Sequence, residues 1–159
     1  ALEGRRIAWF GDGNNVAVSL AQAAALLGFE LALAVPEAFM LPQVVLSWAA
    51  EKPGKITICD TPQAAAEGAA ALVTDCWVSM SDDPETAEKR AAAFAPYQVT
   101  GDLMALGDDA VFLHCLPAYR GNEVTSNVID GPRSVVFDEA ENRCHAQKAI
   151  LTYCLDRDG

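Results

Sequence analysis

Five short, largely apolar runs with strand-type content alternate along the chain with longer helix-like stretches, and this alternation constrains the fold more than any other feature. The runs lie at Ile7–Phe10, Leu31–Val35, Lys55–Cys59, Leu72–Thr74 and Val111–His114. Continuous rather than alternating apolar character is typical of parallel strands that are buried on both faces. The pattern therefore predicts a parallel sheet with helices packed against both of its faces.

Helix start and stop signals separate these runs. The predicted helices are Asn15–Leu27, which ends at Gly28, and then about Pro42–Glu51, Pro62–Ala66, Pro84–Phe94 and Glu139–Leu155. A short extended piece, Ser134–Phe137, precedes the last helix, and the sequence leaves open whether it joins the sheet. Residues 1–159 contain no repeat or linker. We predict a single α/β domain: doubly wound, Rossmann-like and three-layered, with a mainly five-stranded parallel sheet.

Charge and composition exclude several classes of protein. The net charge is −11 and no basic stripe is visible, which argues against nucleic acid as a partner. No apolar stretch approaches the roughly 20 residues that cross a bilayer, and the polar start suggests no signal peptide. The five cysteines form no CxxC pair, so neither a zinc ribbon nor a dithiol redox centre is suggested. Their number is odd and four of them lie in apolar or helical contexts, which favours a reducing cytoplasm. We expect no metal site, because His145, on a predicted helix, is the only histidine besides His114.

The loop after the first predicted strand, residues 11–15, reads Gly-Asp-Gly-Asn-Asn and resembles the opening of a dinucleotide-binding fingerprint. Val16 stands where the third glycine of that fingerprint belongs, which disfavours a nicotinamide-dependent enzyme. A second interpretation is a tight turn in which Asp12 or Asn14 caps the following helix. Because a helix N-terminus next to an amide also suits a small carboxylate, this loop is a candidate binding site.

Three further positions have a structural and a functional interpretation. Asp75 follows a buried strand and either caps the next turn or binds an ammonium group. His114 and Cys115 are either a core pair or, because Pro117 forces the chain out of the sheet, part of a turn at the strand end. Arg143 is either a surface ion-pair residue or a fixed cation for a carbonyl or phosphate oxygen.

Four ordered motifs give the chain a specific resemblance. They read Gly-Asp-Gly-Asn-Asn-Val (11–16), Thr-Asp-Cys-Trp-Val-Ser-Met (74–80), Phe-Leu-His-Cys-Leu-Pro-Ala (112–118) and Phe-Asp-Glu-Ala-Glu-Asn-Arg (137–143). From Leu2 to Leu155 the sequence resembles ornithine carbamoyltransferases. The resemblance implies transfer of a carbamoyl group from carbamoyl phosphate to L-ornithine, without a metal or an organic cofactor. It also implies a cytoplasmic homotrimer that serves arginine biosynthesis.

The resemblance assigns a role to each motif. Asn15 and the backbone of Met80 would bind the α-carboxylate of ornithine, and Asp75 and Ser79 would hold its α-ammonium group. Cys115 would lie beside the attacking δ-nitrogen, with Asp75 close enough to help remove a proton. The remaining groups would face the carbamoyl phosphate; they are His114, the backbone of Cys115 and Leu116, and Arg143.

Two features depart from the family pattern. Ser81 stands where the family has glycine after Ser-Met, in a loop that closes over ornithine. The Ser-x-Arg-Thr-Arg motif of the family's N-terminal carbamoyl-phosphate domain does not occur in these 159 residues, so that domain is expected to be absent. We therefore predict that the isolated chain is inactive. A free-standing amino-acid-binding or regulatory module without catalysis remains the alternative.

Overall fold

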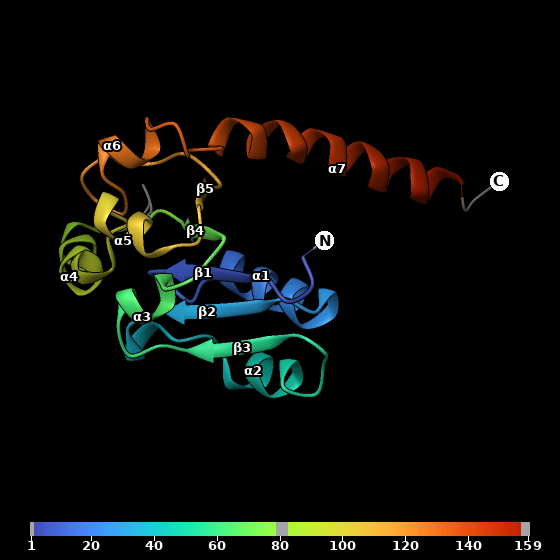
Figure 1. The fold of residues 1–159 in the computed structure, drawn as a ribbon, viewed down its shortest axis with the longest axis horizontal. Helices are drawn as coiled ribbons and strands as arrows, with labels where there is room; N and C mark the ends of the chain where they lie inside the picture. The colour runs from blue at the N-terminus through green and yellow to red at the C-terminus, as the bar shows by residue number, and fades with distance from the viewer. Residues whose placement is uncertain (1, 79–82, 157–159) are drawn as a thin grey trace.

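The computed structural model describes residues 2–78 and 83–156 of the chain. Five parallel strands form one sheet in the order β3-β2-β1-β4-β5 (Figure 1). Their bounds are β1 (Arg6–Phe10), β2 (Glu30–Ala34), β3 (Lys55–Ile58), β4 (Ala71–Thr74) and β5 (Val111–His114). Each predicted strand is present, and the predicted doubly wound α/β fold is confirmed.

The helices include the five predicted and four that the sequence analysis missed. The predicted ones are α1 (Asn15–Leu27), α2 (Gln43–Ala49), α3 (Pro62–Ala66), α4 (Pro84–Phe94) and α7 (Val136–Asp156). The missed ones are short: η1 (Glu37–Phe39), η2 (Ala95–Tyr97), α5 (Gly101–Leu106) and α6 (Ser126–Ile129). Helices of one or two turns show too few residues for a 3.6-residue periodicity to stand out.

Capping residues explain where the predicted helices begin. The Asn14 side chain accepts hydrogen bonds from the backbone N–H groups of Val16 and Ala17, so Asn14 rather than Asp12 caps α1. Thr61 and Asp83 cap α3 and α4 in the same way, each directly before a proline. The start signals in the sequence were therefore correctly interpreted.

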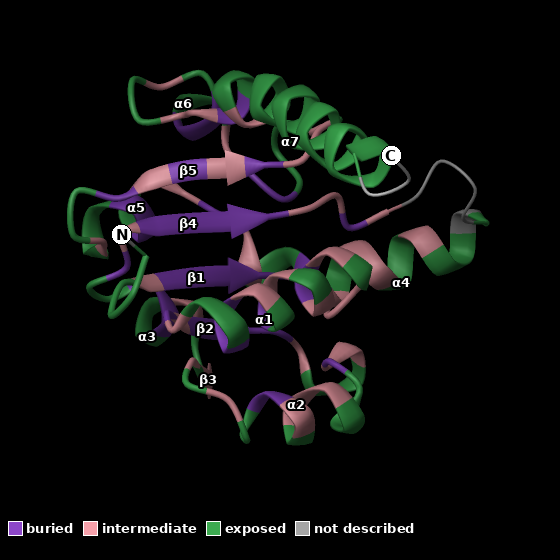
Figure 2. Cartoon of the chain, turned by 90° about the vertical axis from the view of Figure 1, so that its right-hand side faces the viewer, coloured by how far each residue is buried: buried purple, intermediate pink, exposed green. Residues whose placement is uncertain are grey.

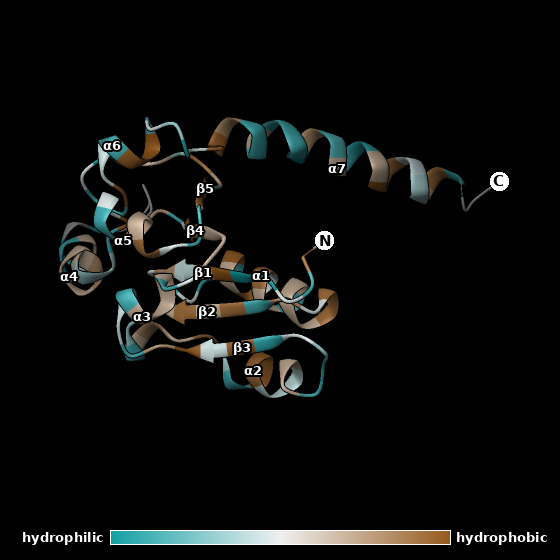
Figure 3. Ribbon diagram, in the orientation of Figure 1, coloured by the Kyte–Doolittle hydropathy of each residue, from teal (hydrophilic) through white to brown (hydrophobic). Residues whose placement is uncertain are grey.

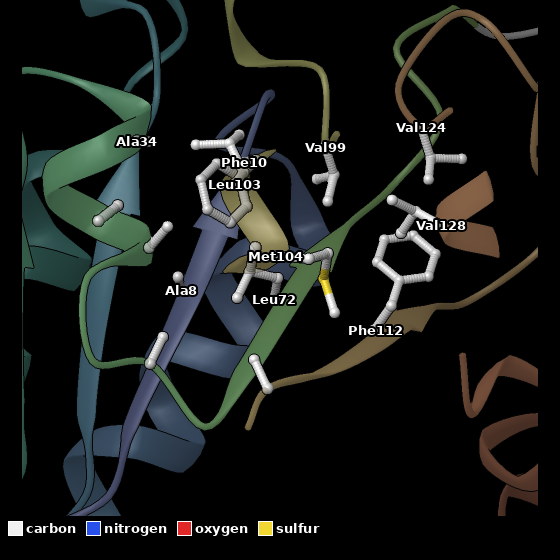
Figure 4. Close-up of a cluster of buried hydrophobic side chains, with 14 of the residues drawn as sticks. Ala8, Phe10, Ala34, Leu72, Val99, Leu103, Met104, Phe112, Val124 and Val128 are labelled. Atoms are coloured by element: carbon white, nitrogen blue, oxygen red, sulfur yellow. The ribbon is translucent and has the colours of Figure 1, made fainter. Parts of the chain in front are cut away.

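The two faces of the sheet bury separate sets of side chains, which produces three layers. Alternate residues along β1 point to opposite faces: Trp9 packs toward α1 and α2, and Phe10 packs toward α3 and α5. Figure 4 shows the second cluster, in which Phe10, Leu72 and Phe112 lie among side chains of the shorter helices. Both faces of β1, β2 and β4 are therefore covered, as the continuous apolar runs predicted, whereas the edge strand β3 was predicted to be buried and is only partly so.

The predicted extended piece Ser134–Phe137 is only partly extended. Ser134 forms a single parallel bridge with Phe112, and the Val135 N–H donates to the Phe112 carbonyl oxygen over 3.0 Å. Helix α7 begins at Val136, earlier than the predicted start at Glu139. The predicted boundary was wrong because β-branched Val135 and Val136 favour strand by local propensity, while tertiary packing buries Val136 at the start of a helix.

Helix α7 extends away from the rest of the domain (Figure 1). Its residues are exposed along nearly its whole length, whereas the central strands are buried (Figure 2). Apolar and polar segments alternate along it in Figure 3, and Ile150, Leu151, Tyr153 and Leu155 are all exposed. Among the described residues, no helix combines the length and the apolar character that a membrane span requires.

Candidate active site

The site lies where the carboxyl ends of β1, β4 and β5 meet. In the sheet order, β1 pairs with β2 on one side and with β4 on the other. The chain adds β2 and β3 on one side of β1 and then returns to add β4 and β5 on the other side, so the strand order reverses between β1 and β4. Open parallel sheets bind ligands at such a switch point. Asn14 follows β1, Asp75 follows β4 and Cys115 follows β5. The fold therefore gathers side chains that are far apart in sequence.

Asp75 is the centre of this cluster. Its Oδ2 accepts a hydrogen bond from Asn14 Nδ2 at 2.9 Å, and its Oδ1 accepts from Cys115 Sγ at 3.0 Å and from the Cys76 N–H at 2.7 Å. Burial raises the pKa of Asp75, but the hydrogen bonds from Cys115, Cys76 and Asn14 outweigh burial and hold the pKa below its usual value. Asp75 is therefore an ionised acceptor at neutral pH, suited to an ammonium group.

The two thiols beside Asp75 stay protonated at neutral pH. Burial, together with the hydrogen bond to Asp75 and its negative charge, raises the pKa of Cys115 to about 12. Burial and the Asp75 charge raise the pKa of Cys76 to about 11. Because the thiolate is the nucleophilic form, the geometry assigns Cys115 the part of a hydrogen-bond donor rather than a covalent nucleophile.

These pKa shifts predict selective protection of Cys115 from alkylation. At pH 8, iodoacetamide is expected to modify Cys115 more than about tenfold more slowly than the exposed thiols of Cys144 and Cys154, because little thiolate forms. Peptide mass spectrometry over a time course measures the three rates in one sample. Asp75→Asn removes the neighbouring charge and should accelerate the reaction at Cys115, while equal rates at Cys115 and Cys144 in the wild type would contradict the assignment.

The ring of His114 points into the protein interior, toward Glu123. It is 0% exposed; its Nε2 lies 3.2 Å from Glu123 Oε1, and its Nδ1 accepts the Leu116 N–H at 2.9 Å. The same oxygen of Glu123 accepts the Tyr119 N–H at 2.6 Å. The backbone N–H of His114 donates to Glu139 Oε2 at 2.9 Å, which ties the end of β5 to α7. The histidine ring therefore contacts protein groups through both nitrogens.

A metal ion would have to disrupt this arrangement. Ligand atoms of Asp75, His114 and Cys115 lie within 4.8 Å of one another, and these are residue types that bind metals. Metal binding requires a thiolate and a free imidazole lone pair. The pKa of Cys115 is raised to about 12, and His114 Nδ1 already accepts the Leu116 N–H. The three side chains are better matched to hydrogen bonding than to metal coordination.

The glycines of the first loop have structural reasons to be glycine. Gly11 has φ +108°, and a Cβ there would lie 2.9 Å from Trp77 Nε1. A Cβ at Gly13 would collide with the backbone of Phe39, whose carbonyl oxygen accepts the Gly13 N–H at 2.9 Å. The close approach that requires Gly13 is therefore to the chain itself. This explains a Gly-x-Gly pattern without a dinucleotide.

Arg90 of α4 connects the first loop to the segment that leaves β4. Its guanidinium pairs with Asp12 and its Nε donates to the Trp77 carbonyl oxygen at 2.8 Å. The same guanidinium lies over the ring of Phe94, 5.2 Å from its centroid. Trp9 Nε1, in β1, donates to the Asp12 carbonyl oxygen at 2.9 Å. These contacts hold the loop that follows β1 and the segment that follows β4.

The structure brings some of the predicted site residues together and separates others. Asp75, His114, Cys115 and Leu116 share one corner of the site. Asn15 is exposed at the first turn of α1. Ser79 and Met80 lie outside the described residues, as does Ser81.

Arg143 lies on the exposed part of α7, one turn beyond Glu139. Residues four apart share a helix face, so Arg143 lies on the same face of α7 as Glu139, whose carboxylate accepts the His114 N–H. Its predicted contact with a carbonyl or phosphate oxygen stays a prediction.

Sequence reasoning missed three contributors. Asn14 was interpreted as a cap, yet its amide nitrogen also bonds to Asp75. Glu123 and Glu139 were not singled out, although both contact His114. For Glu123 a signal existed in Tyr-Arg-Gly-Asn-Glu (119–123): an acidic residue in a turn shortly after a strand end. Its burial, however, could not be read from local sequence.

Comparison with known proteins identifies the family to which the chain is similar. The family model described as "Aspartate/ornithine carbamoyltransferase, Asp/Orn binding domain" matches residues 3–154. Ornithine carbamoyltransferase from Mesorhizobium japonicum is 52% identical over 97% of this chain and 50% of its own length. That from Nitrobacter winogradskyi is 50% identical over 99% of this chain and 51% of its own length.

Solved structures show the same relationship. Ornithine carbamoyltransferase from Pyrococcus furiosus superposes with a TM-score of 0.88 and 45% identity, covering 95% of this chain and 50% of that one. The enzyme from Thermus thermophilus gives 0.82 and 42%, covering 95% and 48%. The chain thus spans about half the length of the relatives it matches. Because the family model matches residues 3–154, the chain belongs to the aspartate/ornithine carbamoyltransferase family and matches its Asp/Orn-binding domain.

Proposed function

We propose that this chain is the ornithine-binding domain of an ornithine carbamoyltransferase. The enzyme would convert carbamoyl phosphate and L-ornithine into L-citrulline and phosphate. The δ-nitrogen attacks the carbamoyl carbon and forms the new C–N bond, and the C–O bond to phosphate breaks with its electron pair leaving on phosphate. The δ-ammonium group loses one proton before it attacks, and the nitrogen loses a second after the C–N bond forms, to bases in the site or to solvent.

The observation that carries this proposal is the ionised Asp75 at the switch point. An acceptor carboxylate held by donors from three separate loops is preorganised and complementary to an ammonium group. Ornithine carries two amino groups, and both are protonated at neutral pH by analogy with the ordinary pKa values of an α-amino group and of lysine. Asp75 is proposed to hold one of them and to help remove a proton from the other.

The remaining ornithine contacts follow from the family resemblance. Asn15, at the start of α1, and the backbone of Met80 are proposed to bind the α-carboxylate, which a helix N-terminus favours. Ser79 is proposed to assist Asp75 at the α-ammonium group. Cys115, whose thiol remains protonated, would lie beside the δ-nitrogen and keep Asp75 correctly oriented.

The carbamoyl phosphate side is proposed to involve the backbone of Cys115 and Leu116 together with Arg143. Attack on the carbonyl builds negative charge on its oxygen, which a fixed guanidinium stabilises. His114 is proposed to act on the carbamoyl phosphate indirectly, because both of its ring nitrogens already bond to the protein. Much of the rate acceleration would come from holding two substrates in attack geometry.

The rest of the enzyme is proposed to come from the half of the relatives that this chain does not match. That half would supply the phosphate-binding Ser-x-Arg-Thr-Arg motif, which does not occur in these 159 residues. The exposed length of α7 is available for contact with it. We further propose a homotrimeric enzyme acting in arginine biosynthesis in the cytoplasm, without a metal or organic cofactor.

A citrulline assay tests the proposal on the full-length polypeptide and on the 159-residue chain. The full-length protein should form citrulline, and the chain alone should form none above background. Cys115→Ala in the full-length protein should lower turnover at least about tenfold, a small part of what such sites contribute. Cys59→Ala is the matched control: this half-buried thiol follows the edge strand β3, away from Asp75, and its loss should leave turnover unchanged.

Two outcomes would count against the proposal. Robust citrulline production by the chain alone would show that no second half is needed. A full-length protein that binds ornithine in calorimetry but forms no citrulline would instead support an amino-acid-binding module without catalysis.

A further inference from the structure

Glu123 is a buried carboxylate directly behind the Cys115 loop, and the mechanism above gives it no role. It is 0% exposed, as is His114. Its Oε1 accepts the Tyr119 N–H at 2.6 Å and faces His114 Nε2 at 3.2 Å. His114 precedes residues 115–118 and Tyr119 follows them. One carboxylate oxygen therefore joins both ends of the loop that carries Cys115 and Leu116.

The hydrogen bonds determine which tautomer His114 adopts. The Leu116 N–H donates to His114 Nδ1 at 2.9 Å, so Nδ1 carries a lone pair. The ring proton therefore resides on Nε2, where it is donated to Glu123 Oε1. The Leu116 N–H and the Glu123 carboxylate therefore favour the same tautomer from the two nitrogens of the ring. The chain of contacts runs from Glu123 through the imidazole to the loop backbone.

Leu116 shows that this loop must be held in place. Its φ is +54°, in the left-handed region that residues with a side chain rarely occupy. Such conformations persist where surrounding contacts over-determine them, and they are concentrated at functional sites. The hydrogen bond from Leu116 to His114 is a contact that fixes this residue. The neighbouring Cys115 thiol then reaches Asp75 at 3.0 Å.

The contact between Glu123 and His114 is also energetically unfavourable as a means of stabilising the fold. Among the described residues, Glu123 Oε2 is buried and meets no hydrogen-bond partner. A buried carboxylate with an unsatisfied oxygen destabilises the folded state, and replacing buried polar groups with well-packed apolar residues is often neutral or stabilising. Stability alone therefore does not account for Glu123.

We propose that Glu123 and His114 are positioning residues that hold the 115–118 loop in its reactive shape. Glu123 selects the His114 tautomer, His114 fixes the Leu116 backbone, and the loop then presents Cys115 to Asp75 and its own backbone to the carbamoyl group. The proposal rests on the proposed function for its catalytic consequence. Its structural content, the tautomer and the loop geometry, can be measured on the 159-residue chain alone.

The first experiment is nitrogen NMR on the chain with labelled histidine. The chain has two histidines, and exposed His145 serves as an internal reference. Wild-type His114 should show the Nε2-protonated tautomer, and Glu123→Gln, whose amide oxygen still accepts, should retain it. Glu123→Leu should lose the single tautomer and alkylate faster at Cys115. A wild-type His114 protonated on Nδ1 would overturn the proposal, even if no variant folded.

The second experiment is steady-state kinetics on the full-length protein. Glu123→Leu should lower kcat about 10²-fold, as small misplacements of reacting groups do. Glu123→Gln should recover kcat to within about fivefold of the wild type, because the acceptor is restored. Val124→Ala is the matched control: it removes buried volume at the adjacent position without touching a hydrogen bond, so kcat should hold.

The outcomes separate two kinds of failure. If Glu123→Leu and Val124→Ala reduce kcat equally, or if Glu123→Gln is as impaired as Glu123→Leu, the pair does not position the loop. If the wild-type full-length protein forms no citrulline, the proposed function fails. In that case the NMR and alkylation results on the chain still decide whether Glu123 sets the tautomer of His114.

Discussion

Asp75→Asn in the full-length protein is expected to lower kcat/KM for ornithine about 10²-fold or more, the range associated with losing a positioned acid–base group. Asparagine keeps the shape of the side chain but has one acceptor oxygen instead of two. Because Asp75 accepts hydrogen bonds at both oxygens, one contact must then meet an NH₂ group. The substitution thus removes the charge that would hold an ammonium group and disturbs the link to Asn14 or Cys115.

Asp108→Asn is the matched control for this substitution. Asp108 is an exposed aspartate in the loop before β5, at the amino ends of the strands and therefore on the side of the sheet opposite the site. Its change to asparagine should leave kcat/KM unaltered. Continuous citrulline measurements over a range of ornithine concentrations provide the values. An Asp75→Asn enzyme within about twofold of wild type would remove Asp75 from the site, since real contacts contribute far more.

The pH dependence of Asp75 has a definite sign. Its pKa in the folded protein lies below the usual 3.8 despite burial, because hydrogen bonds favour the ionised form. Its contribution to stability is therefore present above the unfolded pKa and is lost as pH falls through the folded pKa. The difference in unfolding free energy between wild type and Asp75→Asn should stay constant near neutral pH, begin to shrink as pH approaches 3.8 and be lost as pH falls through the lower folded pKa. Denaturant titrations of the chain at several pH values measure it.

Phe112→Ala is expected to lower the unfolding free energy of the chain by about 3–5 kcal/mol. Phe112 is 0% exposed in β5 and contributes its ring to the core cluster with Met104, Val124 and Val128 (Figure 4). Removing the ring forfeits its transfer free energy and leaves a cavity that rigid neighbours fill only partly. Against a total stability of about 5–15 kcal/mol, this is a large fraction.

Phe137→Ala provides the same chemical change without burial. Phe137 is 78% exposed at the start of α7, so its loss should change the unfolding free energy by no more than about 0.5 kcal/mol. Urea unfolding of the 159-residue chain measures both variants, and unchanged m-values confirm that the denatured state is comparable. Similar losses for the two variants would show that the cluster around Phe112 is not the stabilising core.

Much of the fold could be predicted from local sequence because its signals are local. Continuous apolar runs identified all five strands, and caps such as Asn14 and Asp83 marked helix starts. The short helices α5 and α6 and the start of α7 were missed or misplaced, because a single turn carries little periodicity. Val136 shows the limit: its β-branched side chain favours a strand, yet packing against the sheet makes it helical.

The sequence by itself determined the strands, the family motifs and the choice of Asp75, His114 and Cys115 as candidate site residues, since each follows from residue type, position at a strand end and resemblance. Only the tertiary structure decided how these residues are used. The order β3-β2-β1-β4-β5 brings Asn14 to Asp75 across a separation of 61 residues. The burial of Glu123 turns His114 inward, away from the open side of the site. Contacts of this kind depend on which strands are neighbours and which side chains lose water, and neither is encoded in any short stretch of sequence.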